Sequence, residues 1–357
     1  MKIVQIFPGK VWGGAEQYVL DLGRALQARG HEVEWLCLEV KAVTSRLHAE
    51  QIPFQTIKRI TPALIDGADI VHIHDSRFVS PAVKAARRCR QQPKVIFTRH
   101  IARASRVLPW CRSAWRRLDA IIFVSELARS MWSGVNSWFD PERAVVIHNS
   151  IPPQEAAAPT DTLYNIRSRF GIPSDTPLLM FTGRVRRSKG CETIIEALAP
   201  LSSREFAMIF VGTPKPADYD RRLIALARRH GIADCIHFTG FTPSARDLVA
   251  QATIGLQPSI VREAFGLSQL EFMQAGKPLI TTDNGAQPEY VSDGVTGLLV
   301  PPANPARLSE AIACLLDDSA LRASLGQAAA ESYRTRLSYP LFIDRIINVY
   351  TQAISRP

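Results

Sequence analysis

The chain alternates short apolar runs with segments of helical periodicity, and it does so in two successive series. The first series of runs comprises residues 2–7, 33–38, 70–74, 94–98, 120–125 and 145–150, and the second comprises 178–183, 206–212, 235–240, 254–259, 278–283 and 296–301. Near-continuous apolar strands separated by helices are typical of parallel sheets covered on both faces. The sequence therefore predicts an α/β protein with two doubly wound, Rossmann-like parallel-sheet domains. Such domains bind ligands at the carboxyl ends of their strands, so we expect the two domains to face a central cleft.

The predicted domain boundaries follow from length and from the segment between the two series. A chain of 357 residues suits two domains of ordinary size. The Pro- and Ala-rich segment 151–164 is typical of a linker, which gives an N-terminal domain of residues 1–155 and a C-terminal domain of 156–339. Residues 340–357 form an amphipathic helix that is left over after the second sheet is complete.

Composition limits the protein class. Six cysteines without a CxxC pair favour reduced thiols in the cytoplasm and argue against a disulfide framework or a zinc site. Only five apolar residues precede Pro8, and no apolar run reaches 18 residues, so neither a signal peptide nor a transmembrane helix is expected. The net charge of +10 is uneven, because residues 76–118 contain no acidic side chain.

The segment FTGRVRRSKG, residues 181–190, places Arg184 and Lys189 just beyond a strand that ends near Gly183. Cations beside a glycine that permits close approach suit a phosphate-bearing ligand. A solvated basic loop would give the same composition, and the spacing G-R-x4-K-G favours the phosphate site.

The segment VREAFGLSQLE, which begins at Val261, sets Glu263 just before a helix expected to start near Phe265 and Glu271 inside it. The free N–H groups at a helix start attract anions. The two carboxylates are roughly 9 Å apart along the axis, estimated from a rise of 1.5 Å per residue, so they would hold separate hydroxyl-bearing parts of one ligand. An exposed helix glutamate is the alternative for Glu271, but it lies beside the expected apolar stripe of Leu267, Leu270 and Ala275.

The first domain carries its own candidates. Residues 8–17, PGKVWGGAEQ, follow the first strand and open a helix, and they lack the G-x-G-x-x-G dinucleotide pattern, which disfavours a nicotinamide enzyme. His72 and His74 share a strand face, where in-strand histidines are more often hydrogen-bonded than zinc-bound. His100 ends the fourth strand.

Taken in order, these features resemble a GT-B fold retaining glycosyltransferase of family 4, the glycosyl transferases group 1. They are GGAE, D-I-V-H-x-H, a strand-end His, VVIHNS, G-R-x4-K-G and E-x7-E. The resemblance covers essentially the whole chain. It implies a metal-independent transfer of a hexose-type sugar from a UDP- or GDP-sugar, used as co-substrate, to a glycan or lipid-linked acceptor in lipopolysaccharide or surface polysaccharide synthesis.

The resemblance also implies residue roles. Arg184 and Lys189 would neutralise the donor diphosphate, Glu271 would bind the ribose, and Glu263 would contact the sugar. The C-terminal helix 340–357 would pack back on the N-terminal, acceptor-binding domain. The implied catalytic set is His100, Arg184, Lys189 and Glu263; the donor-binding set is Gly13, Gly14, Gly183, Phe241, Ala264, Phe265, Gly266, Leu267 and Glu271; the acceptor set is Glu16 and His74.

Several alternatives stay open from sequence. In residues 77–117, arginines interleave with Leu108, Trp110, Trp115 and, just beyond, Leu118, which suits an anionic membrane surface, an acidic glycan or a solvated basic face. No nucleic-acid-binding motif accompanies this charge. Asp218-Tyr219-Asp220 matches a metal-binding D-x-D by chance. A nucleotide-sugar epimerase, a phosphorylase and a catalytically silent binding protein are the competing functions.

Overall fold

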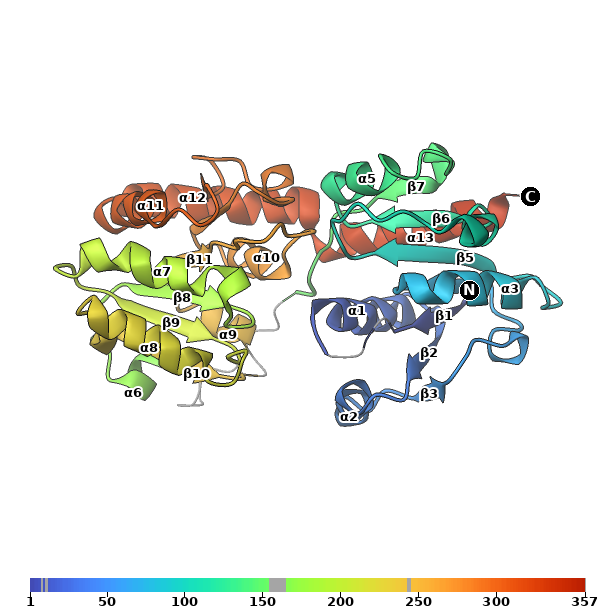
Figure 1. Ribbon diagram of the computed structural model, residues 1–357, viewed down its shortest axis with the longest axis horizontal. Helices are drawn as coiled ribbons and strands as arrows, with labels where there is room; N and C mark the ends of the chain where they lie inside the picture. The colour runs from blue at the N-terminus through green and yellow to red at the C-terminus, as the bar shows by residue number, and fades with distance from the viewer. Residues whose placement is uncertain (8, 10–11, 154–164, 243–244, 357) are drawn as a thin grey trace. The chain divides into compact units, whose positions relative to one another are not determined.

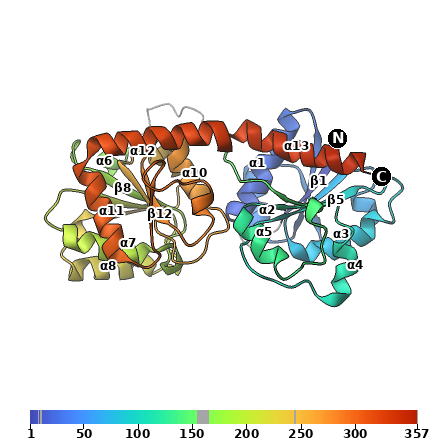
Figure 2. The same ribbon diagram turned by 90° about the horizontal axis from the view of Figure 1, so that it is seen from above.

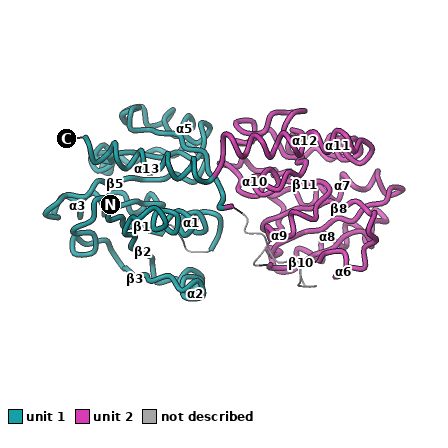
Figure 3. Tube along the Cα trace, turned by 180° about the vertical axis from the view of Figure 1, so that it is seen from behind, with its two compact units in different colours: residues 1–152, 339–357 teal, residues 153–338 magenta. Residues whose placement is uncertain are grey.

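The computed structural model describes residues 1–7, 9, 12–153, 165–242 and 245–356 of the chain. The chain forms two compact units, of which unit 1 comprises Met1–Pro152 with Tyr339–Pro357 and unit 2 comprises Pro153–Ser338 (Figure 3). The predicted linker falls mostly on residues 154–164, which lie outside the described residues.

Unit 1 is built on a seven-stranded parallel sheet in the order β3-β2-β1-β4-β5-β6-β7 (Figure 1). From β1 the chain adds β2 and β3 on one side, then crosses back and adds β4 to β7 on the other side, so the strand order reverses between β1 and β4. The strands are β1 (Lys2–Ile6), β2 (Glu32–Leu38), β3 (Phe54–Ile57), β4 (Ile70–Ile73), β5 (Lys94–Arg99), β6 (Ala120–Phe123) and β7 (Ala144–Val146). The helices are α1 (Gly14–Ala28), α2 (Lys41–Ala49), α3 (Val79–Ala86), α4 (Arg112–Trp115), α5 (Glu126–Ser133) and α13 (Tyr339–Ser355).

Unit 2 is built on a six-stranded parallel sheet in the order β10-β9-β8-β11-β12-β13. Here the order reverses between β8 and β11. The strands are β8 (Leu178–Thr182), β9 (Ala207–Val211), β10 (Ile236–Gly240), β11 (Ile254–Gln257), β12 (Leu279–Thr282) and β13 (Leu298–Val300). The helices are α6 (Ile166–Phe170), α7 (Cys191–Leu198), α8 (Tyr219–Arg229), α9 (Ala245–Val249), α10 (Leu267–Gln274), α11 (Pro305–Asp317) and α12 (Ser319–Ser332).

Every predicted strand is confirmed, and the fold is the predicted pair of doubly wound parallel sheets. One further strand, β3, was not predicted. It is an edge strand that pairs with β2, and its Gln55 and Thr56 are exposed, so it lacks the continuous apolar run of a central strand. Edge strands are covered less completely than central ones, which weakens their apolar signal.

Helix α1 packs an apolar stripe into the core of unit 1, since Val19, Leu22 and Leu26 are fully buried. Gly30 follows its end with φ = +80°, the left-handed conformation that favours glycine at a helix C-terminus. The C-terminal helix α13 contributes Phe342, Ile346 and other apolar residues to the same core and contacts α1 (Figure 2). Unit 1 therefore includes the last helix of the chain.

Candidate functional site

The loops that follow β8 and β11 meet at the carboxyl edge of the unit 2 sheet, where the strand order reverses. Ile260 donates its backbone N–H to the Ser188 carbonyl at 3.0 Å, which ties the two loops together. Gly190 has φ = +78°, and a Cβ atom at this position would lie 1.9 Å from the Pro258 carbonyl oxygen. In doubly wound sheets this position is the usual ligand-binding edge.

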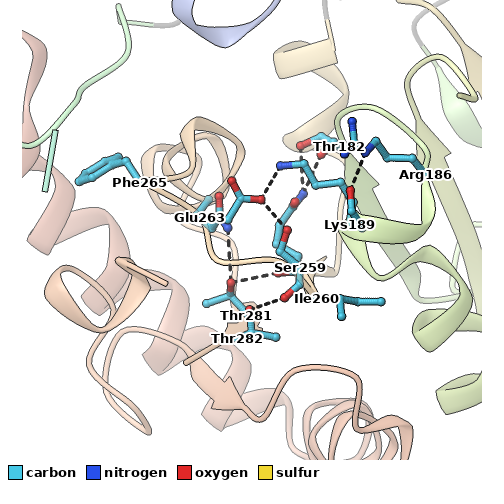
Figure 4. A network of polar contacts seen from close by, with 12 residues as sticks. Thr182, Arg186, Lys189, Ser259, Ile260, Glu263, Phe265, Thr281 and Thr282 are labelled. Atoms are coloured by element: carbon cyan, nitrogen blue, oxygen red, sulfur yellow. Dashed lines mark hydrogen bonds and ion pairs between the residues drawn. The ribbon is translucent and has the colours of Figure 1, made fainter. Parts of the chain in front are cut away.

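An ion pair joins the two loops at this edge, because Lys189 follows β8 and Glu263 follows β11 (Figure 4). The Lys189 ammonium donates a hydrogen bond to Glu263 Oε1, and the Ser259 hydroxyl donates to the same oxygen. Burial alone would raise the pKa of Glu263, but the charge and hydrogen bond of Lys189, together with Ser259, hold the pKa below its ordinary value. Glu263 is therefore ionised at neutral pH, and the ammonium keeps further N–H donors for a ligand.

Arg184 lies in the same loop and is exposed. Within the described residues its guanidinium has no hydrogen bond or ion pair, although its charge contributes to lowering the pKa of Glu263. Its neighbour Arg187 is instead 3.5 Å from a carboxylate oxygen of Glu192. Arg184 is thus a cation next to the ion pair whose hydrogen-bonding capacity is available to an anion.

Glu271 lies on α10 and accepts a hydrogen bond from the Thr182 hydroxyl at 3.1 Å. The Gln257 amide in turn donates to the Thr182 carbonyl and hydroxyl oxygens, at 3.0 and 3.2 Å. Burial raises the pKa of Glu271 from 4.5 to about 7, against the opposing effects of Arg246 and Thr182. The Glu271 carboxyl is therefore near its titration midpoint at neutral pH.

The helix expected near Phe265 begins two residues later, at Leu267. Gly266 has φ = +108°, outside the helical region, and the Phe265 ring is buried against Tyr290 with ring centroids 4.6 Å apart. The Tyr290 hydroxyl donates to the Phe265 carbonyl at 2.7 Å, and Figure 4 shows the Phe265 ring pointing away from the ion pair. Phe265 thus anchors the loop by its side chain.

The predicted apolar stripe of α10 is partly wrong. Leu270 is fully buried, but Leu267 and Ala275 are only partly buried, and the other buried positions are Gln269, Phe272 and Met273.

Two more predicted donor-binding residues, Gly183 and Ala264, lie in the loops after β8 and β11 and are partly buried. Phe241 follows β10 and is 70% exposed, so its ring is free to stack on a ligand.

In unit 1, the residues predicted as candidates follow the neighbouring strands β1, β4 and β5 at the carboxyl edge. Gly14 is the first residue of α1 and Gly13 precedes it. Glu16 is buried in the first turn, and its carboxylate packs against Gly9, where a Cβ would lie 2.0 Å from Oε1. Pro8, Lys10 and Val11 of the predicted loop lie outside the described residues.

The histidines of unit 1 belong to a buried hydrogen-bonded chain that includes three residues sequence reasoning missed, Gln5, Thr98 and Tyr350. Its contacts are His100 Nε2 with His74 Nδ1 at 3.1 Å, His74 Nε2 with Gln5 Oε1 at 2.7 Å, Gln5 Nε2 with Tyr350 Oη at 3.5 Å, Tyr350 Oη with His72 Nδ1 at 2.6 Å, and His72 Nε2 with Thr98 Oγ1 at 2.7 Å. Both ring nitrogens of His72 and of His74 are engaged. His74 therefore contacts His100 here, and no ring nitrogen of His74 is left for an acceptor.

Two family models match the chain almost end to end. The model described as Glycosyltransferase Family 4 matches residues 12–155, and the one described as Glycosyl transferases group 1 matches residues 164–332. The chain belongs to glycosyltransferase family 4, the glycosyl transferases group 1. As a family member it carries G-R-x4-K-G at Gly183–Gly190 and E-x7-E at Glu263–Glu271, the residues that form the edge of unit 2 described above.

Solved structures similar to this glycosyltransferase-family chain show that its fold is GT-B. A glycosyltransferase from Rickettsia africae has a TM-score of 0.88 and 19% identity, covering 100% of this chain and 99% of that one. Anabaena HepE in complex with UDP has a TM-score of 0.84 and 20% identity, covering 98% and 100%. The lipopolysaccharide outer core galactosyltransferase WaaB has a TM-score of 0.72 and 17% identity, covering 98% and 99%.

Among curated relatives, the D-inositol 3-phosphate glycosyltransferase 1 of Catenulispora acidiphila is 33% identical over 230 residues, which are 60% of this chain and 53% of that relative. The chain spans about half the length of the inositol-phosphate relatives that it matches.

The Arg- and Lys-rich residues 77–117 of this glycosyltransferase-family chain do not form one surface. Strand β5 runs through this stretch, so residues 101–110 lie at the carboxyl edge of the sheet, while Lys94, Arg116 and Arg117 lie at the amino edge. A cavity of about 400 Å³ at the amino edge is lined by five cationic side chains and by Asp119, which is 3.7 Å from the Lys94 ammonium; the cations are Arg87, Lys94, Arg116, Arg117 and Arg143. Trp115 and Leu118 are buried in the core, so of the four apolar residues grouped with these arginines only Leu108 and Trp110 are exposed to contact a membrane.

No three His, Cys, Asp or Glu side chains are grouped to hold a metal ion in the part of the chain that the structure describes. Asp218 and Asp220 lie at the start of α8, and Asp218 pairs with Arg222 at 3.0 Å. None of the described helices combines the length and the apolar character needed to cross a bilayer.

Proposed function

We propose that the protein is a retaining, metal-independent glycosyltransferase that moves a hexose-type sugar from a UDP- or GDP-sugar to a glycan or lipid-linked acceptor. The observation that carries this proposal is the arrangement of Arg184, Lys189 and Glu263 where the strand order of unit 2 reverses. The UDP complex of the similar Anabaena protein supports a nucleotide diphosphate as the ligand.

The proposed reaction breaks the bond between the anomeric carbon and the diphosphate, so negative charge grows on the leaving phosphate. Arg184 and Lys189 are placed to stabilise that charge, and the Glu263–Lys189 ion pair fixes the ammonium before the substrate arrives. Prepositioned donors of this kind contribute on the order of 3 kcal/mol each to transition-state stabilisation. The family resemblance implies front-face attack, in which the leaving phosphate takes the acceptor's proton. In the same proposal His100 contacts a substrate hydroxyl.

The proposed donor site is tested by a thermal-shift panel of nucleoside diphosphates and their sugars. A ligand that binds only the folded protein raises the melting temperature. We expect one diphosphate and its sugars to raise it and the corresponding nucleoside to have little effect. A panel in which no nucleoside diphosphate shifts the melting temperature would refute the proposal, and product analysis with the best donor would separate transfer from epimerisation.

We expect the affinity for the preferred nucleoside diphosphate to rise with pH through about 7. In the proposed complex the ribose hydroxyls donate to Glu271, and only the ionised carboxylate accepts from both. With a pKa of about 7, Glu271 is mostly protonated at pH 6 and mostly ionised at pH 8. The dissociation constant should therefore fall by about tenfold over this range, since affinity scales with the competent fraction. Calorimetry at both pH values measures it.

Glu271→Gln is the control, because it removes the titrating group and leaves the ligand's own phosphate titration in place. An equal pH dependence in the variant and the wild type would contradict the role of Glu271.

The raised pKa of Glu271 also has a consequence for the stability of the fold. The folded carboxyl keeps a proton that the unfolded chain has lost between pH 4.5 and about 7, so wild-type stability should fall as pH rises through this window, relative to the variant.

We further propose that the acceptor is lipid-linked or of the lipopolysaccharide type, and that the protein acts at the inner face of the cytoplasmic membrane. The segment 101–110 supports this, because Ile101, Leu108 and Trp110 are 52%, 52% and 75% exposed. Arg103 and Arg106 are exposed in the same segment, and cations beside exposed apolar side chains suit an anionic bilayer surface. The similar WaaB, a lipopolysaccharide galactosyltransferase by its title, is consistent with this acceptor class.

The segment is held in place by buried groups. Asn136 accepts from the Val107 N–H at 2.9 Å and donates to the Ser105 carbonyl at 2.9 Å. The buried Arg99 donates to the Arg103 carbonyl at 2.7 Å. These contacts fix the backbone of the segment, so its exposed side chains can meet a membrane without the backbone having to become ordered first.

Vesicles containing an anionic lipid should sediment the protein at low salt, and Trp110→Ser with Leu108→Ser should lower the bound fraction by about tenfold or more. Each exposed side chain contributes about 1–2 kcal/mol when it enters a bilayer. The matched control is Arg87→Gln with Arg117→Gln, which removes cations from the other edge of the sheet. Equal binding to neutral vesicles, or a larger loss in the control, would contradict the proposal.

A further inference from the structure

The hydrogen-bonded chain in unit 1 runs from His100 to Thr98 through side chains of β1, β4, β5 and α13, and beyond it Thr98 is hydrogen-bonded to the buried Tyr18 hydroxyl. Its members in order are His100, His74, Gln5, Tyr350, His72 and Thr98. All but His100 are buried with relative exposures of 0–4%. The described structure gives Nδ1 of His100 no hydrogen bond, so this nitrogen is the open end of the chain.

All three imidazole rings are neutral. Burial lowers the pKa of His72 to about 3 and that of His100 to about 4, and burial together with the neighbouring rings lowers the pKa of His74 well below its ordinary value. A neutral imidazole has one N–H donor and one bare nitrogen acceptor. A ring that donates a hydrogen bond to one neighbour must therefore accept one from the other.

Gln5 sets that direction because its amide has one accepting and one donating end. Its Oε1 lies 2.7 Å from His74 Nε2, so His74 donates through Nε2 and accepts at Nδ1. His100 must then donate through Nε2 to His74. On the other side, Gln5 Nε2 donates to Tyr350, whose hydroxyl donates to His72 Nδ1, and His72 donates through Nε2 to Thr98.

The reverse direction requires a flipped Gln5 amide and the proton on Nδ1 of all three rings. A neutral histidine side chain intrinsically favours the proton on Nε2. With the Gln5 amide oriented as in the structure, all three histidines carry their proton on Nε2, which is the preferred tautomer. With the amide flipped, all three would carry it on Nδ1. The three preferences add because the rings are coupled through one amide.

We propose that Gln5, held by Tyr350 of the C-terminal helix, fixes His100 in the Nε2–H tautomer, so that its bare Nδ1 accepts a hydrogen bond from a substrate hydroxyl. Gln5, His74 and Tyr350 are positioning residues that act through His100. The tautomer itself is a property of the free protein, whereas the substrate contact rests on the proposed function. His100 then selects a hydroxyl at this place, because a bare nitrogen repels a carbonyl or ether oxygen.

The tautomer is tested without any ligand, by long-range ¹H–¹⁵N correlation spectra of protein labelled with ¹⁵N-histidine. The signals are assigned by their loss in single variants of each histidine. We expect His72, His74 and His100 each to show a protonated Nε2 and a bare Nδ1 at pH 7. A protonated Nδ1 on His100, or an imidazolium, would overturn the proposal whether or not the protein binds nucleotide sugars.

Tyr350→Phe removes the hydroxyl that orients Gln5, and Tyr339→Phe is its matched control on the same helix, since Tyr339 is not part of the chain. In Tyr350→Phe we expect His100 to populate both tautomers, and the kcat on the best donor of the thermal-shift panel to fall by about tenfold with little change in nucleotide affinity. The control should retain the wild-type spectrum and kcat. A pure Nε2–H His100 in Tyr350→Phe would show that Tyr350 has no such role.

If Tyr350→Phe does not fold, Gln5→Met supplies the same comparison by removing the acceptor of His74. His100 should again populate both tautomers. An unchanged His100 spectrum in a folded Gln5→Met protein would overturn the proposed role of Gln5. In the outcome where the tautomers are as expected but no donor is turned over, the proposed function fails and the assigned direction of the chain stands.

Discussion

Arg184→Ala should lower turnover of the nucleotide sugar by about 100-fold or more and leave the melting temperature within about 1 °C of the wild type. Its guanidinium has no hydrogen bond or ion pair among the residues that the structure describes, so its removal breaks no protein contact of that kind. Exposed substitutions of this sort usually change stability by less than about 0.5 kcal/mol. Losing one prepositioned donor to a developing negative charge costs about 100- to 1,000-fold in turnover.

Arg187→Ala is the matched control, because it removes an arginine from the same loop that lies 3.5 Å from Glu192. Its turnover should stay within about twofold of the wild type. Steady-state kinetics with the preferred donor and a thermal melt are measured on both variants. Near-normal turnover in Arg184→Ala, or an equal loss in both, would mean that Arg184 does not hold the diphosphate.

Lys189 differs from Arg184 although the two were given the same role from sequence. Lys189→Ala should lower turnover too, but it also leaves the mostly buried Glu263 carboxylate without its counter-ion. Removing one partner of a buried pair costs up to about 3–5 kcal/mol, and less here since both side chains keep some exposure. Arg184 is therefore the residue that separates catalysis from stability.

Most of the fold could be predicted from the sequence because its central strands are buried on both faces. Runs such as residues 206–212 are apolar throughout, and with helical segments between them such runs are typical of a parallel sheet covered on both sides. The edge strand β3 could not be predicted, since half of its side chains face solvent and its sequence does not differ from a loop. The start of α10 was placed too early because the conformation of Gly266 is not evident from its type.

The site of unit 2 could be predicted in part because its cations and carboxylates lie within two short segments with specific spacing. The sequence does not predict which side chain each of these charged groups contacts. Lys189 and Glu263 are 74 positions apart, and only the pairing of β8 with β11 brings them together. Gln5 and Tyr350 are 345 positions apart, and a tyrosine in an amphipathic helix gives no sign that it bonds to a glutamine on the first strand.

The same convergence of loops predicts a large loss of stability when a side chain is added at Gly190. Gly190→Ala should lower the stability of unit 2 by about 4 kcal/mol, of which about 1 comes from the left-handed backbone and the rest from overpacking against a rigid carbonyl. Gly171→Ala isolates the first contribution, because Gly171 has φ = +65° and a Cβ there would have no atom within 4 Å. For a unit of this size the melting temperature should fall by on the order of 10 °C in Gly190→Ala and by a few degrees in Gly171→Ala. Because the displaced Pro258 carbonyl directly precedes Ser259, Gly190→Ala should also weaken binding of the nucleoside diphosphate, and Gly171→Ala should not. Equal melting temperatures for the two variants would show that the loops after β8 and β11 are not packed as closely as the structure places them, and the ion pair of Lys189 with Glu263 would then lose its geometric basis.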